Sequence, residues 1–453
     1  MKVAIVGGGG FRTPTVHACL SDAVDRVDLE EVVLHDVDAD RLASILAVIH
    51  GMDRERGGAA LAVRTTTSLD DAVEDSGAVL VAIRVGGLAA RMVDEAVPLE
   101  LGVLGQETVG PGGIVFALRT IPVMRSIASL VRDRAPGAWI VNFTNPAGIV
   151  TETIREVAGD LVVGICDSPT ALSARVAAAL GGRVRSFHFD HAGLNHLGWL
   201  LGVDDADHDL LPELLADEDR LSRVEEARRS GTERVRSLGA IPNEYLVYLD
   251  RAAEVTAAFR RDGTRASILA DQQRGFFAEP PGDPASALAR WRRARDLRHG
   301  TYMAEAPVRA GTEPADIEPA ESDPDAPGDR GYAAIAVDFL EATSGGPRSI
   351  VLDTANRGRL NEVGDDEVVE VTCDVDRDGV RPVPGRRLPT EAAELVVRIK
   401  DVERLTRRAS EAGSAALALD AIAAHPVVPS RDLATRILEG YLTRHHALRD
   451  LLR

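Results

Sequence analysis

Hydrophobic and polar positions divide the first part of the chain into short apolar runs and longer amphipathic segments. This alternation is typical of parallel strands joined by crossover helices. Thr13-Pro14 predicts a helix start, with threonine as the cap and proline at the first helical position, and residues 68–71 have the spacing of a capping box. We therefore expect an α/β fold, with a Rossmann-like doubly wound parallel sheet over residues 1–182. The expected strands are at 3–6, 31–35, 62–65, 78–83, 138–142 and 161–165.

After residue 182 the regular alternation gives way to longer helical segments at 211–238 and 284–298, with strands near Val351 and at 368–373. Residues 390–453 have helical periodicity throughout. The pattern predicts a mixed α+β second domain over 183–453, which we expect to serve substrate binding and oligomerisation. Residues 304–331 are rich in proline and acidic residues and almost without large apolar ones, so we expect a disordered or solvated loop there.

The composition limits the classes of partner. A formal net charge of −19 argues against nucleic acid, because binding a polyanion requires a dominant basic surface. An anionic substrate would therefore need a local arginine cluster. The three cysteines, Cys19, Cys166 and Cys373, are too few for a disulfide framework and fit a reducing compartment. Because no run approaches about 20 uninterrupted apolar residues and no signal-peptide pattern is found, we expect a cytoplasmic protein with no membrane partner.

A dinucleotide site is predicted where the first strand ends. Gly7, Gly8, Gly9 and Gly10 follow this strand and precede a helix, so backbone N–H groups at the helix N-terminus can approach a pyrophosphate. Asp36 ends the second strand, where the ribose diol of NAD requires an acceptor. The two features together predict NAD binding, and a glycine-rich turn without a ligand is the alternative.

Polar side chains follow the later strands, at the edge where open parallel sheets bind their ligands. They are Arg84, Asn142, Asn145, Cys166 and Asp167. We expect Arg84 to lie beside the cofactor. Downstream, His196 lies among apolar residues and glycines, where a histidine is more often part of the core than a ligand. A thiolate and an imidazole can share a divalent metal, but a spacing of thirty residues between Cys166 and His196 is no recognised metal motif.

Successive segments resemble the motifs of glycoside hydrolase family 4, in order and over nearly the whole chain. They are GGGGFRTP (7–14), IRVGGLAARMVDE (83–95), GVLGQETVGPGGI (102–114), NFTNPAGIVTE (142–152), GICDSP (164–169), GLNHLGW (193–199), IPNEYLVYL (241–249) and ANRGRLNEVGDDEVVEV (355–371). The family is an NAD-dependent exception to the two-carboxylate glycosidase scheme. The resemblance implies transient oxidation of sugar carbon 3 by NAD, loss of the proton on carbon 2, elimination of the glycosidic oxygen, and addition of water before the hydride returns.

The resemblance also implies roles for individual residues. Cys166 and His196 match the protein ligands of a divalent metal, typically Mn²⁺, which acts as a Lewis acid on the sugar oxygens. Tyr245 matches the base that removes the proton from carbon 2. Asp167 is either an acid for the departing oxygen or an orienting neighbour of the metal site. The expected substrate contacts are Arg91, Glu107, Asn145, Asn195 and Arg265.

Two departures from the family pattern concern the substrate. Relatives usually have a serine after the third glycine, where this chain has Gly10-Phe11-Arg12, so Arg12 offers a charge in place of a small hydroxyl. Cys-Asp-x-Pro at 166–169 is common among 6-phospho-α-glucosidases, whereas the segments at 83–91, 148–152 and 193–199 are closer to those of 6-phospho-β-glucosidases.

We expect a 6-phospho-β-glucosidase acting on a phosphorylated disaccharide or aryl glucoside, as a homo-oligomer (dimer or tetramer). The α-specific enzyme is the alternative. A plain NAD-dependent hydroxy-acid dehydrogenase is a further one, because it would use the same first domain.

Overall fold

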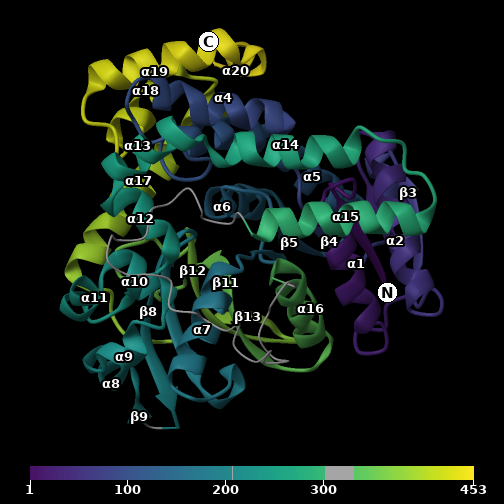
Figure 1. Cartoon of the computed structure of the whole chain (residues 1–453), viewed down its shortest axis with the longest axis horizontal. Coiled ribbons are helices and arrows are strands. Elements are labelled where there is room, and N and C mark those ends of the chain that lie inside the picture. Colours follow the sequence, from purple (N-terminus) through teal and green to yellow (C-terminus); the bar gives the residue numbers. More distant parts are fainter. Residues whose placement is uncertain (207, 301–330, 453) are drawn as a thin grey trace.

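The computed structural model describes residues 1–206, 208–300 and 331–452. A single mixed sheet runs through its centre (Figure 1). The strands are β1 (Lys2–Val6), β2 (Glu31–His35), β3 (Ala62–Thr66), β4 (Ala78–Val81), β5 (Trp139–Asn142), β6 (Val162–Gly164), β7 (His188–Leu194), β8 (Leu197–Asp205), β9 (His208–Asp209), β10 (Ile241–Pro242), β11 (Arg348–Ala355), β12 (Val368–Asp376) and β13 (Gly379–Pro382). Their order is β10-β8-β7-β12-β11-β6-β5-β4-β1-β2-β3, with β13 beside β12 and β9 beside β8.

The six strands predicted in the first part of the chain are confirmed, with ends that shift by no more than two residues. They pair in parallel in the order 3-2-1-4-5-6 of a dinucleotide-binding domain. Helices cover both faces, so alternate side chains of one strand enter different cores: Val3 and Ile5 pack into one and Ala4 and Val6 into the other. The Rossmann-like fold is thus confirmed.

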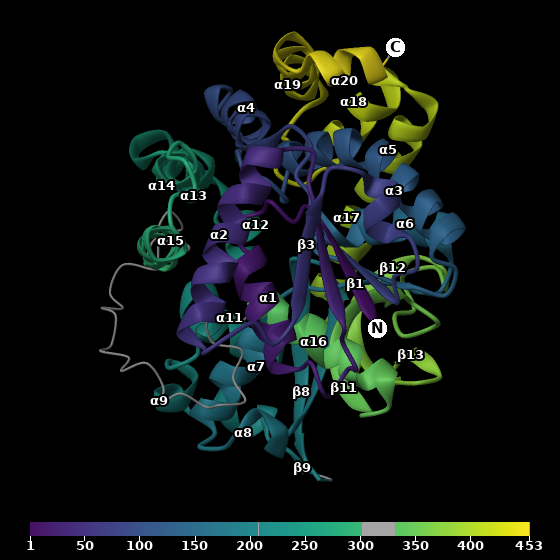
Figure 2. The ribbon, with the colours of Figure 1, turned by 90° about the vertical axis from the view of Figure 1, so that its right-hand side faces the viewer.

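Two groups of helices cover the parallel strands, with α1 and α2 on one face and α3, α5 and α6 on the other (Figure 2). The helices of this part are α1 (Thr13–Asp22), α2 (Ala39–Glu55), α3 (Leu69–Val73), α4 (Gly87–Glu100), α5 (Pro111–Arg134), α6 (Ala147–Ala158) and α7 (Ser168–Ala179). Ser68 caps α3 as predicted, since its side chain accepts the N–H of Asp71. The predicted Thr13 cap is wrong, because α1 begins at Thr13 itself and Arg12 takes the cap position without a side-chain capping bond.

The second part of the chain extends the same sheet in antiparallel fashion. β11 pairs with β6, β12 pairs with β11 and β7, and β7 forms a hairpin with β8. The strands predicted near Val351 and at 368–373 are β11 and β12, whereas β7 and β8 were not predicted. The mixed α+β character is confirmed, and the boundary at residue 182 stays a prediction.

The remaining helices confirm the segment predicted at 284–298 but divide the segments 211–238 and 390–453 into several helices each. They are α8 (Leu211–Ala216), α9 (Glu218–Leu221), α10 (Glu225–Ser230), α11 (Thr232–Leu238), α12 (Val247–Asp250), α13 (Ala252–Asp262), α14 (Arg265–Phe277), α15 (Pro284–His299), α16 (Gly331–Ser344), α17 (Thr390–Ala412), α18 (Ala415–Ala424), α19 (Arg431–Arg444) and α20 (His446–Leu451), with 3-10 turns η1 (Val184–Ser186) and η2 (Glu244–Leu246). The segment 211–238 is four helices because Asp217 caps a new one and Gly231 adopts a left-handed φ of 91°.

The predicted loop at 304–331 lies outside the described residues, apart from Gly331, which opens α16. One helix, α5, is long and apolar enough to cross a membrane by length and composition. Two-thirds of its most apolar window is buried, and its Ala117, Met124 and Ile127 pack with β1 and β4 in one core. We therefore assign α5 as a core helix.

Candidate active site

The glycine-rich turn fits closely against β2 and β4. The N–H groups of Gly7 and Gly8 both donate to the carbonyl of His35, at 2.9 and 2.7 Å. Gly7 has a left-handed φ of 93°, and a Cβ there would lie 2.4 Å from the carbonyl oxygen of Ala82. Only glycine fits this position, so the turn can deliver the chain directly to the N-terminus of α1, where main-chain N–H groups favour an anion.

Asp36 is fixed at the carboxyl end of β2. One of its carboxylate oxygens accepts the N–H of Gly9 and the other the N–H of Asp38, both at 3.1 Å. Its neighbour Val37 is an apolar side chain that is 88% exposed at the rim of the adjoining cavity. A carboxylate beside an open apolar surface is the arrangement that a ribose and its base require.

Charged side chains from α4 and from the loops before α4 and α5 form a largely buried network. Glu107 lies 2.6 Å from a guanidinium nitrogen of Arg84 and 2.9 Å from one of Arg91, and Arg91 also pairs with Glu95 at 2.7 Å. Burial acts to raise the pKa of Glu107, but the two guanidinium groups outweigh it and lower that pKa to about 2. Glu107 is thus a permanent anion that orients Arg84 and Arg91.

The aromatic ring of Tyr245 stacks on the imidazole of His196, with ring centres 3.8 Å apart and planes parallel within 1°. Tyr245 lies in η2, where the side chain of Asn243 accepts its N–H at 2.9 Å. His196 is buried in the tight turn between β7 and β8 with a left-handed φ of 61°. Burial lowers the pKa of His196 to about 4, although nearby Glu107 opposes this change, so the ring is neutral near pH 7.

Cys166 and Asp167 follow β6 and meet Tyr332 from α16. The Cys166 Sγ lies 3.8 Å from the Tyr332 hydroxyl, which also forms a hydrogen bond with Asp167. Burial raises the pKa of the Cys166 thiol well above its ordinary value, and the carboxylates of Glu370 and Asp167 add to the rise. Burial also raises the pKa of Asp167, against the opposing charge of Arg12.

Arginine side chains gather near the same end of the cavity. Arg265 opens α14 and donates to the carbonyl of Arg298 at 3.1 Å, and Arg12 lies 4.9 Å over the ring of Tyr332. Burial lowers the pKa of Arg298 to about 9, and the like charges of Arg12, Arg265 and Arg91 add to this effect. This is the local arginine cluster that an acidic chain needs for an anionic ligand.

The two asparagines predicted to contact substrate line different cavities. Asn145 lines the large cavity, at the end of a loop that Asn142 braces through its bonds to Thr144. Asn195 instead donates to Glu370 at 3.0 Å and lines a smaller cavity next to His196. Its side chain is therefore turned toward a buried carboxylate in this structure.

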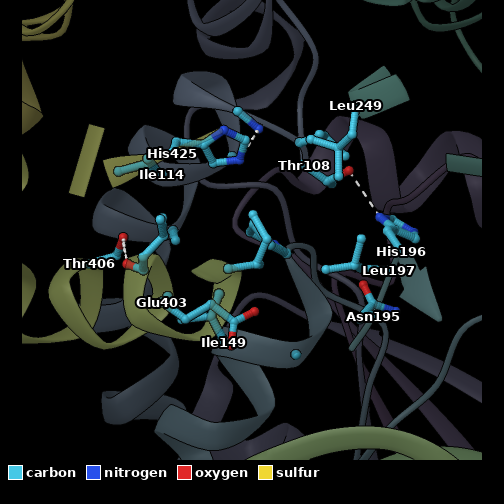
Figure 3. Close-up of a pocket in the computed structure, with 18 residues that line it drawn as sticks. Thr108, Ile114, Ile149, Asn195, His196, Leu197, Leu249, Glu403, Thr406 and His425 are labelled. Atoms are coloured by element: carbon cyan, nitrogen blue, oxygen red, sulfur yellow. Dashed lines mark hydrogen bonds between the residues drawn. The ribbon is translucent and has the colours of Figure 1, made fainter. Parts of the chain in front are cut away.

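The large cavity has a volume of about 1050 Å³ and extends from the glycine-rich turn to Tyr245. It brings together the following predicted residues: Gly7, Gly10, Asp36, Arg84, Arg91, Glu107, Asn145, Asp167, Tyr245 and Arg265. Gly8, Gly9, Cys166, Asn195 and His196 are not in its lining. His196 and Asn195 line the smaller cavity of about 70 Å³, which also reaches Glu403 and His425 (Figure 3).

Cys166 and His196 have the chemistry of metal ligands. His196 is neutral and its Nδ1 is bonded to Thr108, while the acidic neighbours of Cys166 would favour a divalent cation, whose own charge would in turn stabilise the thiolate. Within the part of the chain that the structure describes, no group of three or more His, Cys, Asp or Glu side chains is arranged to hold a metal. A metal at this pair would therefore depend on ligands from the substrate and solvent.

Several residues of the site carry no recognisable sequence signal. Tyr332 and Arg298 lie far along the chain from the strand ends, and they reach the cavity only because α15 and α16 pack beside α2 and α1. Thr108, which forms a hydrogen bond with His196, lies in the motif at 102–114. Its position in the sequence gives no reason to connect it with a histidine 88 residues away.

Comparison with known proteins agrees with this geometry. Two family models match the chain, Family 4 glycosyl hydrolase over residues 2–182 and Family 4 glycosyl hydrolase C-terminal domain over 191–428. A probable 6-phospho-beta-glucosidase from Bacillus subtilis is 30% identical, over 99% of this chain and 97% of its own length.

Two solved structures are also similar. The 6-phospho-beta-glucosidase from Thermotoga maritima, with NAD and glucose-6-phosphate, has a TM-score of 0.80 and 25% identity over 100% of both chains. A 6-phospho-alpha-glucosidase from gut microorganisms, with NAD and Mn²⁺, has a TM-score of 0.79 and 25% identity over 98% of this chain and 97% of its own. The motifs, the fold and both matches agree: the chain belongs to glycoside hydrolase family 4.

Proposed function

We propose that this chain hydrolyses 6-phospho-β-glucosides with NAD and a divalent metal, through transient oxidation of sugar carbon 3 rather than direct displacement by a pair of carboxylates. The observation that carries the proposal is the single cavity that joins the glycine-rich turn to Asp167 and Tyr245. Its volume is at the upper end of the roughly 300–1,000 Å³ of small-molecule sites, which suits a dinucleotide and a sugar held together.

The cofactor end of the cavity supports NAD. The N-terminus of α1 and the glycine-rich turn would hold the pyrophosphate, and Asp36 would accept the hydroxyls of the adenine ribose. A carboxylate at this position also disfavours a 2′-phosphate, so NADP should bind less well. NAD, when bound, accepts hydride from sugar carbon 3 and later returns it.

The arginine cluster supports a phosphorylated sugar. Arg298 is close enough to Arg12, Arg265 and Arg91 for their like charges to act on it, and bringing buried cations together costs free energy. A phosphate dianion between them would offset this repulsion and accept several charge-assisted hydrogen bonds. Arg12 would thereby replace the small hydroxyl that relatives carry after the third glycine.

The proton-transfer residues lie at the other end of the site. Tyr245 would remove the proton from carbon 2, and the positive charge of Arg91, which interacts with Tyr245, favours the phenolate that this role requires. Asp167 would protonate the departing oxygen, since its burial raises its pKa and so favours the protonated acid. A divalent metal on Cys166 and His196 would stabilise negative charge on the sugar oxygens.

A matched pair of substrates tests the proposal. The purified protein is assayed with nitrophenyl 6-phospho-α- and β-glucosides, with NAD, Mn²⁺ and a thiol reductant, while absorbance at the NADH wavelength is followed in parallel. We expect nitrophenol release from the β substrate without steady accumulation of NADH. Steady NADH formation without sugar release would indicate a dehydrogenase instead.

The α anomer is a second candidate because of Asp167. This residue is part of Cys-Asp-x-Pro, and the gut-microbial relative named a 6-phospho-alpha-glucosidase is as similar in sequence as the Thermotoga maritima β enzyme. Faster release from the α substrate would establish this alternative and reject β selectivity.

A further inference from the structure

The loop before α5 contains a side-chain amide that accepts three hydrogen bonds. The Oε1 of Gln106 accepts the N–H of Thr108 at 2.6 Å, the N–H of Val109 at 2.7 Å and the Thr108 hydroxyl at 3.0 Å. Because two of these donors are main-chain N–H groups, the accepting atom must be the amide oxygen and not the amide nitrogen. Gln106 is buried, so this arrangement is held away from solvent.

The hydroxyl of Thr108 connects this amide to His196. It lies 3.0 Å from the Nδ1 of His196, a bond drawn in Figure 3. A hydroxyl has one hydrogen, and the short contact between the Thr108 and Gln106 oxygens requires that hydrogen, because the amide oxygen has none. The hydroxyl oxygen can then only accept from His196, which places a hydrogen on Nδ1 and a free lone pair on Nε2.

We propose that Gln106 and Thr108 are positioning residues that fix the tautomer of His196 so that its Nε2 is ready to bind a divalent metal. The inference rests on the proposed function, in which His196 is a metal ligand. Histidine in water favours the opposite tautomer, with its hydrogen on Nε2, and this hydrogen would have to be displaced before a metal could bind there. The stacked ring of Tyr245 fixes the plane of the imidazole. The hydrogen bonds from Gln106 through the Thr108 hydroxyl determine which imidazole nitrogen carries no hydrogen.

The tautomer can be observed without substrate or turnover. Full-length protein with ¹⁵N-labelled histidine is stripped of metal and studied by NMR near pH 7.5, and the His196 signals are identified by their loss in His196→Gln. We expect Nδ1 at the shift of a protonated ring nitrogen and Nε2 at that of an unprotonated one. Thr108→Val, which keeps the shape but removes the hydroxyl, should move the population toward the Nε2-protonated form, and Thr108→Ser should restore the wild-type pattern.

Metal affinity provides the second measurement. Calorimetric titration with Mn²⁺ should show a loss of about 10- to 100-fold in Thr108→Val, the usual effect of removing an outer hydrogen-bond partner, and near wild-type affinity in Thr108→Ser. NAD affinity should be unchanged in both variants, and this result would show that their fold is intact.

The outcomes separate this inference from the proposed function. A hydrogen on Nε2 in the wild-type protein, or equal Mn²⁺ affinity in the Val and Ser variants, overturns the positioning role even if the protein is an active glucosidase. The expected tautomer with Thr108-dependent Mn²⁺ binding supports the role even if neither phosphoglucoside is hydrolysed.

Discussion

The substitution Asp353→Asn should make the folded chain markedly less sensitive to rising pH. Asp353 lies on β11, directly opposite Glu370 of β12, and is fully buried. Neither of its carboxylate oxygens has a hydrogen-bond partner among the described residues. Burial, together with the charge of Glu403, raises its pKa from 3.8 to about 8 against the opposing effect of Lys400.

The sign of the effect follows from which state holds the proton. Between about pH 4 and pH 8 the folded chain keeps Asp353 protonated, whereas the unfolded chain releases that proton, so rising pH favours unfolding. Each pH unit contributes about 1.36 kcal/mol, so the three units from pH 5 to pH 8 remove up to about 4 kcal/mol from the free energy of unfolding. Asparagine has the shape of the protonated acid and cannot ionise, so the variant does not incur this loss.

Urea denaturation near pH 5 and near pH 8, followed by tryptophan fluorescence, measures the difference. The advantage of Asp353→Asn over the wild type should grow by up to about 4 kcal/mol between the two conditions. Asp366→Asn is the matched control, because that side chain is 97% exposed and should leave the pH dependence as it is in the wild type. An advantage for Asp353→Asn that is the same at both pH values would refute the reasoning.

The remaining predictions concern the proposed chemistry. Cys166→Ser and His196→Ala should each abolish hydrolysis while the NAD dissociation constant, measured by fluorescence titration, stays within a few-fold; wild-type turnover by either variant would falsify the metal assignment. Hydrolysis in deuterated water should leave deuterium on carbon 2 of the product, detected by mass spectrometry, and Tyr245→Phe should suppress both turnover and labelling; unlabelled product from the wild type would reject the elimination route. Asp167→Asn should slow hydrolysis of a phosphorylated disaccharide by roughly 10²-fold or more and of the nitrophenyl substrate far less, because nitrophenolate needs little protonation to leave. Equal losses on both substrates would instead assign Asp167 a supporting role at the metal.

The sequence predicts those parts of the site that depend on local rules. Parallel strands were recognisable from their apolar runs, and since such strands end at one edge of a sheet, Asp36, Arg84, Asn145 and Asp167 could be expected to meet. All four line the large cavity. Gly7 was likewise identifiable, because a strand-to-helix turn of this kind requires a residue with positive φ.

Other features depend on tertiary packing and had no local signal. The hairpin of β7 and β8 contains glycines and a histidine with left-handed φ, which interrupt the alternation by which strands are identified. Arg298 lies on α15 and Tyr332 on α16, and both helices come later in the sequence than the other residues that line the large cavity. The Thr13 cap failed for a local reason: the tight turn at Gly10 accepts the N–H of Thr13 through its own carbonyl, so helical geometry begins one residue early.

The continuous sheet sets the distance between the two ends of the site. Asp36 follows β2 and Asp167 follows β6, and β1, β4 and β5 lie between those strands. Four steps of about 4.8 Å each separate the two strands by roughly 19 Å across the sheet. Main-chain hydrogen bonds fix this separation, so the distance between the strands that precede Asp36 and Asp167 is a property of the scaffold that no movement of a surface loop can alter.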